Sequence, residues 1–470
     1  MRRFLLRHRK LRLALGRSLS ALACIWRRLM FRTTFVAVTG SLGKTTATRC
    51  LHAILSSCYS TSWAHGHNSR FAMASAILRT RLRHRFTLIE VGTTLPGALR
   101  RTAWTLAPDT AVVLAVARVH SNNFATLDDI AHEKSQLLSR LGLRGIAVLN
   151  GDDPLVAAMA ARCRGPVVMF GRSPEFYVWA SDVSSVWPAR LSFRVHRGAE
   201  SRAVRTQMVG EHWLSAVLAA FAAALWQGVD LDTAVAAVER LAPTPGRLEP
   251  MPLPSGAMAL RDEYNYSLAS LTPALRVLEQ ARVPGRRILV TPRMVDTGRG
   301  FRESFRSLGE LAVRSVELVI VIGNEHRRAF HAMVEGGMRP ENIRGFKDIW
   351  GAAECLKSET RAGDLVLFRN CPTLRAERIY FSQLGSVGCR TPVCPLLNPC
   401  DYCPELRPGL ENVLVMPAPP RPFWLATTRT GGPQSVVGPS PGAGPVPPRQ
   451  HRAESGHDEE QERTGAAGPQ

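Results

Sequence analysis

The sequence feature that most constrains the fold is a glycine-rich loop placed between two segments of different periodicity. Residues 33–39 form a short run with strong β-propensity, and residues 46–57 carry apolar side chains at helical spacing. Between them lies the segment Gly40-Ser41-Leu42-Gly43-Lys44-Thr45-Thr46. A strand, a glycine loop and a helix in this order can bind nucleotide phosphates, so the segment predicts a nucleotide-binding α/β domain.

The residue types in this loop suit ATP and Mg²⁺. Gly40 and Gly43 allow backbone N–H groups to approach phosphate oxygens without a clashing Cβ, and the helix N-terminus adds partial positive charge. Lys44 is expected to reach the β- and γ-phosphates, and Thr45 to bind Mg²⁺ through its hydroxyl. The alternative is an ordinary glycine turn before a helix. A lysine–threonine pair here disfavours that alternative, because the whole chain contains only five lysines.

The rest of the chain predicts an α/β fold in two domains. Helical segments separate further short strands, which we expect at 86–91, 110–117, 145–150, 287–291, 316–323 and 364–368. This alternation indicates a central, mostly parallel-sheet phosphate-loop ATPase domain, followed by a smaller, Rossmann-like α/β domain. The expected boundaries are 1–32 for a basic amphipathic segment, 33–242 for the central domain, 243–385 for the C-terminal domain, 386–406 for a Cys-rich knuckle and 407–470 for a Pro/Gly-rich, disordered tail.

The chain is strongly basic, with a formal net charge of +22. The excess consists almost entirely of arginine, which is typical of a GC-rich genome; an anionic substrate or membrane surface is the alternative. Residues 1–32 contain ten Lys/Arg and no acidic residue. We expect either a helix packed on the first domain or an amphipathic helix that contacts anionic lipid. No run approaches the roughly 20 apolar residues that span a bilayer, and no nucleic-acid-binding signature is present.

The ten cysteines fall into two groups. Six are scattered, which favours reduced thiols and a cytoplasmic location. The other four are clustered: Cys389, Cys394, Cys400 and Cys403. Four thiolates within a short Pro-containing segment suit tetrahedral zinc. Free or disulfide-bonded cysteines and an Fe–S cluster are the alternatives.

The loop Thr39–Thr46 resembles that of the Mur ligases, the ATP-dependent enzymes that build the peptide of bacterial peptidoglycan. Three further matches follow in that family's order. Glu90-Val-Gly92 is similar to its metal-binding Glu-x-Gly, and His120 resembles its second metal-site residue. Lys134 resembles a lysine that becomes carbamylated and supports a metal. For His120 the alternative is a histidine with a structural role, and for Lys134 it is an exposed lysine on a helix. The matches are most similar to the family's D-alanyl-D-alanine-adding branch.

Looser matches continue to about residue 380. They are Ala147–Asp153, which ends in Asn-x-Asp-Asp; Gly210-Glu-His212, near the family's adenine site; Gly246-Arg247, with the hinge arginine that touches nucleotide phosphates; Asp262-Glu-Tyr264-Asn265; and the closing segments Gly363–Arg369 and Arg375–Arg378.

The resemblance implies an ADP-forming acid–amino-acid ligase, which activates a carboxylate as an acyl phosphate for attack by an amine. The catalytic residues that it implies are Lys44, Glu90, His120, Lys134 and Arg247. The implied nucleotide-binding residues are Gly40, Ser41, Leu42, Gly43, Lys44, Thr45, Thr46, Arg247, Asp262 and Asn265. The implied Mg²⁺ site consists of Thr45, Glu90, His120 and carbamylated Lys134. The partners would be small-molecule or peptide carboxylates and amines.

Three interpretations remain open at this point. The first is an amide ligase that serves a cell-envelope polymer, a capsule or a specialised metabolite. The second is a D-alanyl-D-alanine-adding peptidoglycan ligase that depends on a partner for its UDP-linked substrate, because only about 32 residues precede the loop and leave no room for the family's N-terminal UDP-sugar domain. The third is a non-catalytic nucleotide-binding scaffold, which Trp213 in place of the family's asparagine favours.

Overall fold

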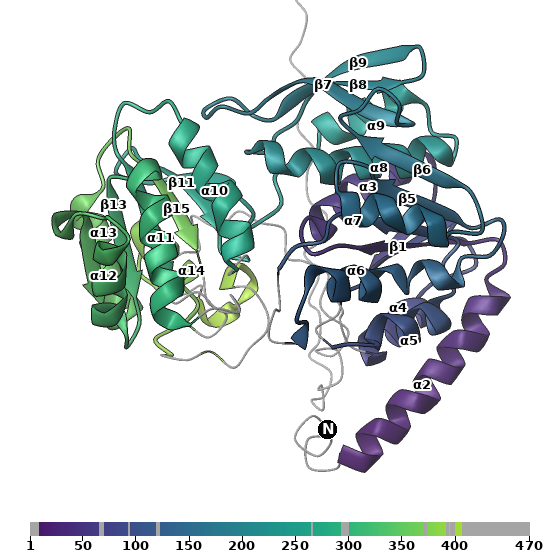
Figure 1. Cartoon of the computed structure of the whole chain (residues 1–470). Helices are drawn as coiled ribbons and strands as arrows, with labels where there is room; N and C mark the ends of the chain where they lie inside the picture. The colour runs from purple at the N-terminus through teal and green to yellow at the C-terminus, as the bar shows by residue number, and fades with distance from the viewer. Residues whose placement is uncertain are drawn as a thin grey trace, which may run out of the picture. The chain divides into compact units, whose positions relative to one another are not determined.

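Two sheets organise the chain (Figure 1). The computed structural model describes residues 9–64, 70–92, 95–118, 123–264, 267–292, 300–369, 374–391, 394 and 400–406. Both sheets are mostly parallel and alternate with helices along the chain, which confirms the predicted α/β class.

The first sheet has nine strands in the order β2-β3-β1-β4-β5-β6-β7-β8-β9. The strands are β1 Thr34–Thr39, β2 Thr61–Ala64, β3 Phe86–Glu90, β4 Thr110–Val113, β5 Ile146–Asn150, β6 Val167–Gly171, β7 Val178–Ser184, β8 Ser192–Arg197 and β9 Glu200–Arg205. In this order, the first seven strands, from β2 at the edge to β7, are parallel to their neighbours. Strands β7, β8 and β9 form an antiparallel meander. Because β1 lies between β3 and β4, the carboxyl ends of these three strands meet at one edge of the sheet, where open α/β sheets bind ligands.

Helices cover both faces of this sheet. They are α2 Arg9–Leu29, α3 Lys44–Cys58, α4 Arg70–Leu78, α5 Ala98–Leu106, α6 Leu127–Ser135, α7 Pro154–Ala157, α8 Leu214–Trp226 and α9 Leu231–Glu239, with the 3-10 turns η2 Leu138–Arg140, η3 Ala158–Arg162 and η4 Glu211–Trp213. One core cluster contains α3, α8 and α9, and another contains side chains of α2, α4 and α5.

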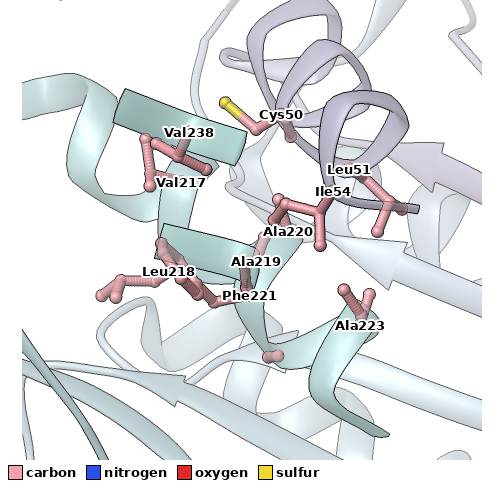
Figure 2. Close-up of a cluster of buried hydrophobic side chains, with 14 of the residues drawn as sticks. Cys50, Leu51, Ile54, Val217, Leu218, Ala219, Ala220, Phe221, Ala223 and Val238 are labelled. Carbon is pink, nitrogen blue, oxygen red and sulfur yellow. The ribbon is translucent and has the colours of Figure 1, made fainter. Parts of the chain in front are cut away.

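The packing of α8 against α3 fixes the helix that follows the glycine loop. Figure 2 shows Leu51 and Ile54 of α3 beside the small side chains Ala219, Ala220 and Ala223 of α8. Alanines allow the two helix backbones to approach closely while both apolar faces are removed from water. The N-terminus of α3 is therefore held against the sheet by a rigid core.

The second sheet has six strands in the order β10-β11-β15-β12-β13-β14. The strands are β10 Glu249–Pro252, β11 Met258–Asp262, β12 Arg287–Pro292, β13 Leu318–Ile322, β14 Ile343–Phe346 and β15 Leu365–Arg369. Only β10 is antiparallel to its neighbour. The helical elements are α10 Leu268–Gln280, α11 Phe301–Ser315, α12 His326–Glu335, α13 Ile349–Glu359 and α14 Glu377–Leu384, with η5 Pro340–Asn342, η6 Cys400–Tyr402 and η7 Pro404–Leu406.

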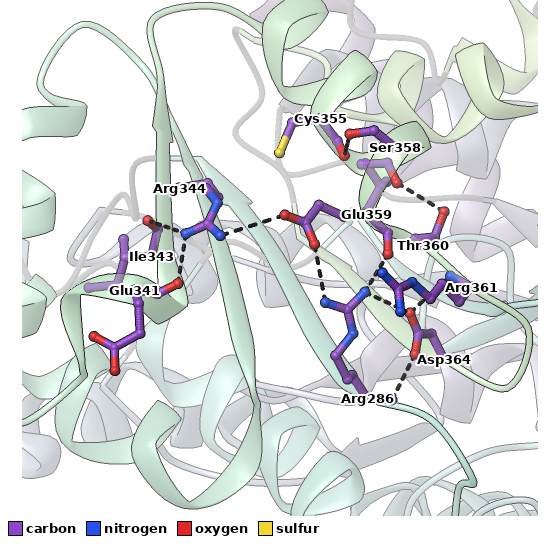
Figure 3. Close-up of polar contacts among 11 residues, drawn as sticks. Arg286, Glu341, Ile343, Arg344, Cys355, Ser358, Glu359, Thr360, Arg361 and Asp364 are labelled. Carbon is purple, nitrogen blue, oxygen red and sulfur yellow. Dashed lines mark hydrogen bonds and ion pairs between the residues drawn. The ribbon is translucent and has the colours of Figure 1, made fainter.

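A polar network joins the connecting segments at the start of these strands (Figure 3). Arg286 donates to Glu359 Oε2 at 3.1 Å and to Asp364 Oδ2 at 3.2 Å. Its backbone N–H donates to Asp364 Oδ1 at 2.7 Å, and Arg344 pairs with Glu359 at 3.6 Å. The entry of β12 is thereby tied to the turn that precedes β15, two strands that lie side by side in the sheet.

Within the described residues, no helix has both the length and the apolar character needed to cross a bilayer.

Candidate nucleotide and ligase site

The glycine loop leaves β1 and is fastened to the exit of β4. Ser41 N–H donates to Ala115 O at 2.8 Å, and Ser41 Oγ exchanges two hydrogen bonds with the backbone of Ala117 at 2.9 and 3.0 Å. Gly43, at φ +81°, stands directly before α3 in the left-handed region, which glycine adopts without strain. The loop therefore presents the N-terminus of α3 at the carboxyl edge of the sheet.

Lys44 folds back over the loop that precedes it. Its Nζ donates to Gly40 O at 2.6 Å, as the first residue of α3. Burial lowers the pKa of Lys44 to about 8, and the nearby Glu90 carboxylate opposes this shift. An amine that hydrogen-bonds a neutral carbonyl can exchange that bond for a stronger, charge-assisted one to a phosphate oxygen.

Glu90 and the threonines of α3 form a polar group with unused bonding capacity. Thr45 Oγ1 donates to Glu90 Oε2 at 3.0 Å. Among the described residues, Thr46 Oγ1 is buried without a hydrogen-bond partner, and the Trp63 side chain also acts on Glu90, lowering its pKa by hydrogen bonding. Burial raises the pKa of Glu90, against the opposing effects of Thr45 and Lys44. A carboxylate oxygen and hydroxyls are hard ligands of the kind that Mg²⁺ prefers, so this donor set fits Mg²⁺ with a triphosphate.

Lys134 is placed by the geometry of α6. The helix begins with a capping box formed by Thr126 and Asp129. Near its end, Glu133 accepts hydrogen bonds from Gly97 N and Leu99 N, each at 2.7 Å, at the N-terminus of α5.

The adjacent Lys134 side chain is buried rather than exposed. Burial lowers its pKa to about 7, and Lys44 is close enough to add to the lowering. The structure thus brings the two lysines into one electrostatic environment.

Arg247 reaches the same threonine from the segment that precedes β10. Its Nη2 donates to Thr45 Oγ1 at 3.4 Å. Burial lowers the pKa of Arg247, and the carboxylates of Asp262 and Glu90 oppose this effect. Asp262 stands at the end of β11 and is ion-paired with Arg369 at the end of β15. The guanidinium of Arg369 also donates to Ser270 Oγ at 2.8 Å.

Hydrogen bonds and shared charge effects therefore join Lys44, Thr45, Glu90, Lys134 and Arg247. Asp262 is connected to this group through Arg247. His120 and Asn265 lie outside the described residues.

The structure gives no support to the zinc site predicted for the four clustered cysteines. All four are free thiols, and no group of three or more metal-binding side chains occurs within the part of the chain that the structure describes. Cys400 is buried in the core, and burial raises its pKa, which keeps the thiol protonated. Arg378 donates to Cys389 at 3.7 Å. The segment is held instead by Asp401, which accepts bonds of 2.7 and 3.0 Å from Arg261.

Two residues that support the loop were not singled out individually from the sequence. Asn150 Nδ2 donates to Leu114 O at 2.8 Å, and Asp153 Oδ2 accepts from Val116 N at 2.8 Å. They hold the backbone to which Ser41 is bonded. The signal in the sequence was the Asn-x-Asp-Asp at the end of β5, which sequence analysis identified without a role.

Comparison with known families agrees with this arrangement. A Mur ligase middle domain model matches residues 38–224, and a Mur ligase glutamate ligase domain model matches residues 246–369. The chain belongs to the Mur ligase family. Mur ligases are ATP-dependent ligases that use Mg²⁺, so this Mur ligase is an enzyme of that type, as the loop predicted.

The relatives of this Mur ligase include UDP-N-acetylmuramoyl-tripeptide–D-alanyl-D-alanine ligases. The protein from Escherichia coli strain K12 is 30% identical over 307 residues, which cover 64% of this chain and 67% of the relative. The protein from Mycobacterium tuberculosis strain CDC 1551 is 27% identical over 365 residues, covering 72% and 70%.

Solved structures share the fold of this Mur ligase. MurF from Acinetobacter baumannii superposes with a TM-score of 0.70 at 23% identity, covering 78% of this chain and 80% of that one. MurF from Thermotoga maritima in complex with ADP gives a TM-score of 0.69 at 22% identity, covering 78% and 82%.

Proposed function

We propose that this Mur ligase joins D-alanyl-D-alanine to the peptide carboxylate of a UDP-N-acetylmuramoyl tripeptide, in the cytoplasm, where ATP is available. The observation that carries the proposal is the assembly of Lys44, Thr45, Glu90, Lys134 and Arg247, in which Glu90 and Lys134 are buried, on a chain whose relatives bear that name. A scaffold that only bound nucleotide would not need the buried Lys134 near Lys44.

In the proposed reaction, a carboxylate oxygen attacks the γ-phosphorus of ATP, and the bond to the ADP oxygen breaks. The amine nitrogen then attacks the acyl carbon and loses a proton, while phosphate leaves with its oxygen. We assign the neutralisation of phosphoryl charge to Lys44, to the amides of residues 40–46 and to Arg247. The partial burial of Lys44 and Arg247 supports this assignment, because charges act more strongly where water is excluded.

We propose that Thr45 and Glu90 hold Mg²⁺, which would polarise the transferring phosphoryl group. The direct contact between the Thr45 hydroxyl and the Glu90 carboxylate supports this role. His120 keeps its proposed metal role from the sequence match alone. Asp262 and Asn265 are proposed to serve the nucleotide, the former by orienting Arg247.

We propose that Lys134 is carbamylated. The reaction forms a bond between Nζ and the carbon of CO₂ and releases a proton, so it requires the neutral amine. A pKa of about 7 supplies that form near neutral pH. The product is a carboxylate, which would favour a cation at the neighbouring site.

The test is ligation by the purified full chain with Mg-ATP, the UDP-linked tripeptide and D-alanyl-D-alanine, followed by phosphate release and product mass. We expect release to require both substrates and Lys44→Ala to lower kcat by about 100-fold or more. Lys357→Ala, which alters an exposed lysine, is the matched control.

Nucleotide binding without phosphate release by the wild type, under conditions in which a known ligase is active, would instead indicate the scaffold. Turnover only with other carboxylates or amines would retain the ligase and replace the substrate.

A further inference from the structure

One side of α2 carries an exposed apolar stripe. Leu22, Ile25 and Leu29 are 57%, 56% and 56% exposed, and spacings of three and four residues place them on one face of the helix. Phe31, just beyond the helix, is 81% exposed, and Leu82, in the loop after α4, is 74% exposed. We call these five side chains the α2 surface.

The opposite side of α2 is firmly packed. Ala23 and Met30 are buried in the core cluster that includes α4 and α5. Trp26 Nε1 donates to Thr80 O at 3.0 Å, and Arg27 binds Leu106 O at 2.9 Å and Asp109 at 2.7 Å. In Figure 1, α2 runs along the outer side of these helices. The orientation of the stripe is therefore fixed by structure, and its exposure does not result from a frayed helix.

Backbone contacts bring the loop that carries Leu82 to the end of α2. Arg85 Nη1 donates to Arg32 O at 2.9 Å, and Thr33 Oγ1 donates to His84 O at 2.7 Å. Thr34 N also donates to Arg85 O at 2.9 Å. Leu82 and Phe31 thus belong to segments that are tied together, although about fifty residues separate them in sequence.

The surroundings of this surface are cationic. Residues 1–89 contain 17 Lys/Arg and no Asp or Glu. Five exposed arginines lie close in sequence to the apolar side chains; they are Arg28, Arg32, Arg81, Arg83 and Arg85. Asp109, which contacts α2, is already paired with Arg27 and with Phe35 N. Apolar side chains interleaved with arginines are complementary to a partner that has anionic groups at its surface and an apolar layer directly below them.

We propose that the α2 surface docks this ligase on a bilayer that contains anionic phospholipid. The leucines, Ile25 and Phe31 would enter the boundary between headgroups and acyl chains, while the arginines bind lipid phosphates. A second copy of the chain is disfavoured as the occupant, because it would place two strongly cationic faces together. The proposal does not depend on the substrate of the ligase.

The test is sedimentation of the full chain with vesicles of phosphatidylcholine alone or with phosphatidylglycerol added. We expect binding to the anionic vesicles only, with weakening at high salt. Ile25→Glu/Arg28→Glu should lower the partition coefficient about tenfold or more, because it removes one apolar contact and reverses one charge. The control is Val313→Glu/Arg314→Glu on α11, which changes an exposed apolar residue and an exposed arginine and alters the net charge equally.

Absence of binding by the wild type, or equal loss in both double variants, would overturn the proposal. Sedimentation velocity without lipid tests whether a second copy of the chain binds the α2 surface. A dimer that Ile25→Glu/Arg28→Glu dissociates would identify the surface as a protein contact instead. Equal thermal unfolding midpoints and ATP affinities for both variants show that the fold is intact. Because no readout uses ligation, failure here is distinguishable from failure of the proposed substrate.

Discussion

At the scale of single residues, Gly40 is a position where one methyl group should disturb the site. A Cβ there would lie 2.8 Å from Leu114 Cβ and 3.1 Å from Leu42 O. We expect Gly40→Ala to displace the loop from the exit of β4, to lower ATP affinity about tenfold or more and to cost about 1–3 kcal/mol of stability. Titration calorimetry measures the ATP affinity, and urea unfolding measures the stability. Gly142→Ala, whose Cβ would meet nothing within 4 Å, is the control, and equal effects in the two variants would contradict the argument.

In CO₂-free buffer, in which Lys134 is a free amine, this residue should make stability depend on pH. Its folded pKa of about 7 lies below the unfolded value of 10.5, so between these values the unfolded chain binds a proton that the folded chain lacks. The free energy of unfolding should therefore rise with pH across that window and be lowest below about 7. Lys134→Met should remove this dependence and stabilise the protein at pH 7.5 by on the order of a few kcal/mol.

Urea unfolding of wild type and Lys134→Met between pH 7 and 10 measures the difference between their free energies of unfolding. The contributions of titratable groups common to both proteins cancel in this difference. Lys347→Met changes an exposed lysine and should leave the pH dependence unchanged. A wild type and a Lys134→Met variant with parallel pH profiles would show that the Lys134 amine is solvated. Carbamylation would appear separately, as an added mass that is lost when CO₂ is removed.

At the scale of elements, the start of α7 serves the loop indirectly. Asp153 caps α7 by accepting from Leu155 N and Val156 N, and it also accepts from Val116 N at the exit of β4. Asp153→Ala should therefore cost about 1–2 kcal/mol and also weaken ATP binding, because Ala115 and Ala117 hold Ser41. Asp230→Ala removes a comparable cap from α9. It should lower the unfolding temperature without changing nucleotide affinity, and a weakened affinity there would argue against a local effect.

The elements that could be predicted from sequence are those with a strong local pattern. β1, β3, β5, β12, β13 and β15 are short apolar runs, and the structure places strands at each. β2, β10 and β14 were not predicted, because Thr61–Ala64, Glu249–Pro252 and Ile343–Phe346 have four residues each and two of them include Pro or Gly. Their strand conformation depends on neighbours, as β2 does on β3. The glycine loop and Lys134 could likewise be identified from local sequence patterns. The hydrogen bond by which Asn150 supports the loop could not, because it requires knowledge of which strands are adjacent.

At the scale of the whole molecule, the cysteine segment is held by contacts that its spacing alone does not indicate. The spacing of the cysteines is local information, and it suggested a metal. The contacts that hold the segment are long-range: Asp401 pairs with Arg261, 140 residues away, and Arg261 also contacts Glu263 at 2.9 Å and lies over the ring of Tyr380 at 4.7 Å. A sequence pattern cannot reveal a partner at that separation, so the spacing predicted a metal and gave no sign of this ion pair.

The anchoring of this segment leads to a prediction that separates an ion pair from a metal. Asp401→Ala should leave Arg261 without two of its bonds and cost about 1–3 kcal/mol, because Arg261 keeps its ion pairs with Glu263 and Glu249. Cys400 is buried in the wild type, and in the variant it should react faster with a thiol reagent. A zinc chelator should change neither the stability of the wild type nor the reactivity of its Cys400. Glu335→Ala, which removes the exposed partner of Arg302, should have little effect on either. If the chelator destabilises the wild type and releases zinc, the four thiols must rearrange to bind metal and the ion pair is not what holds the segment.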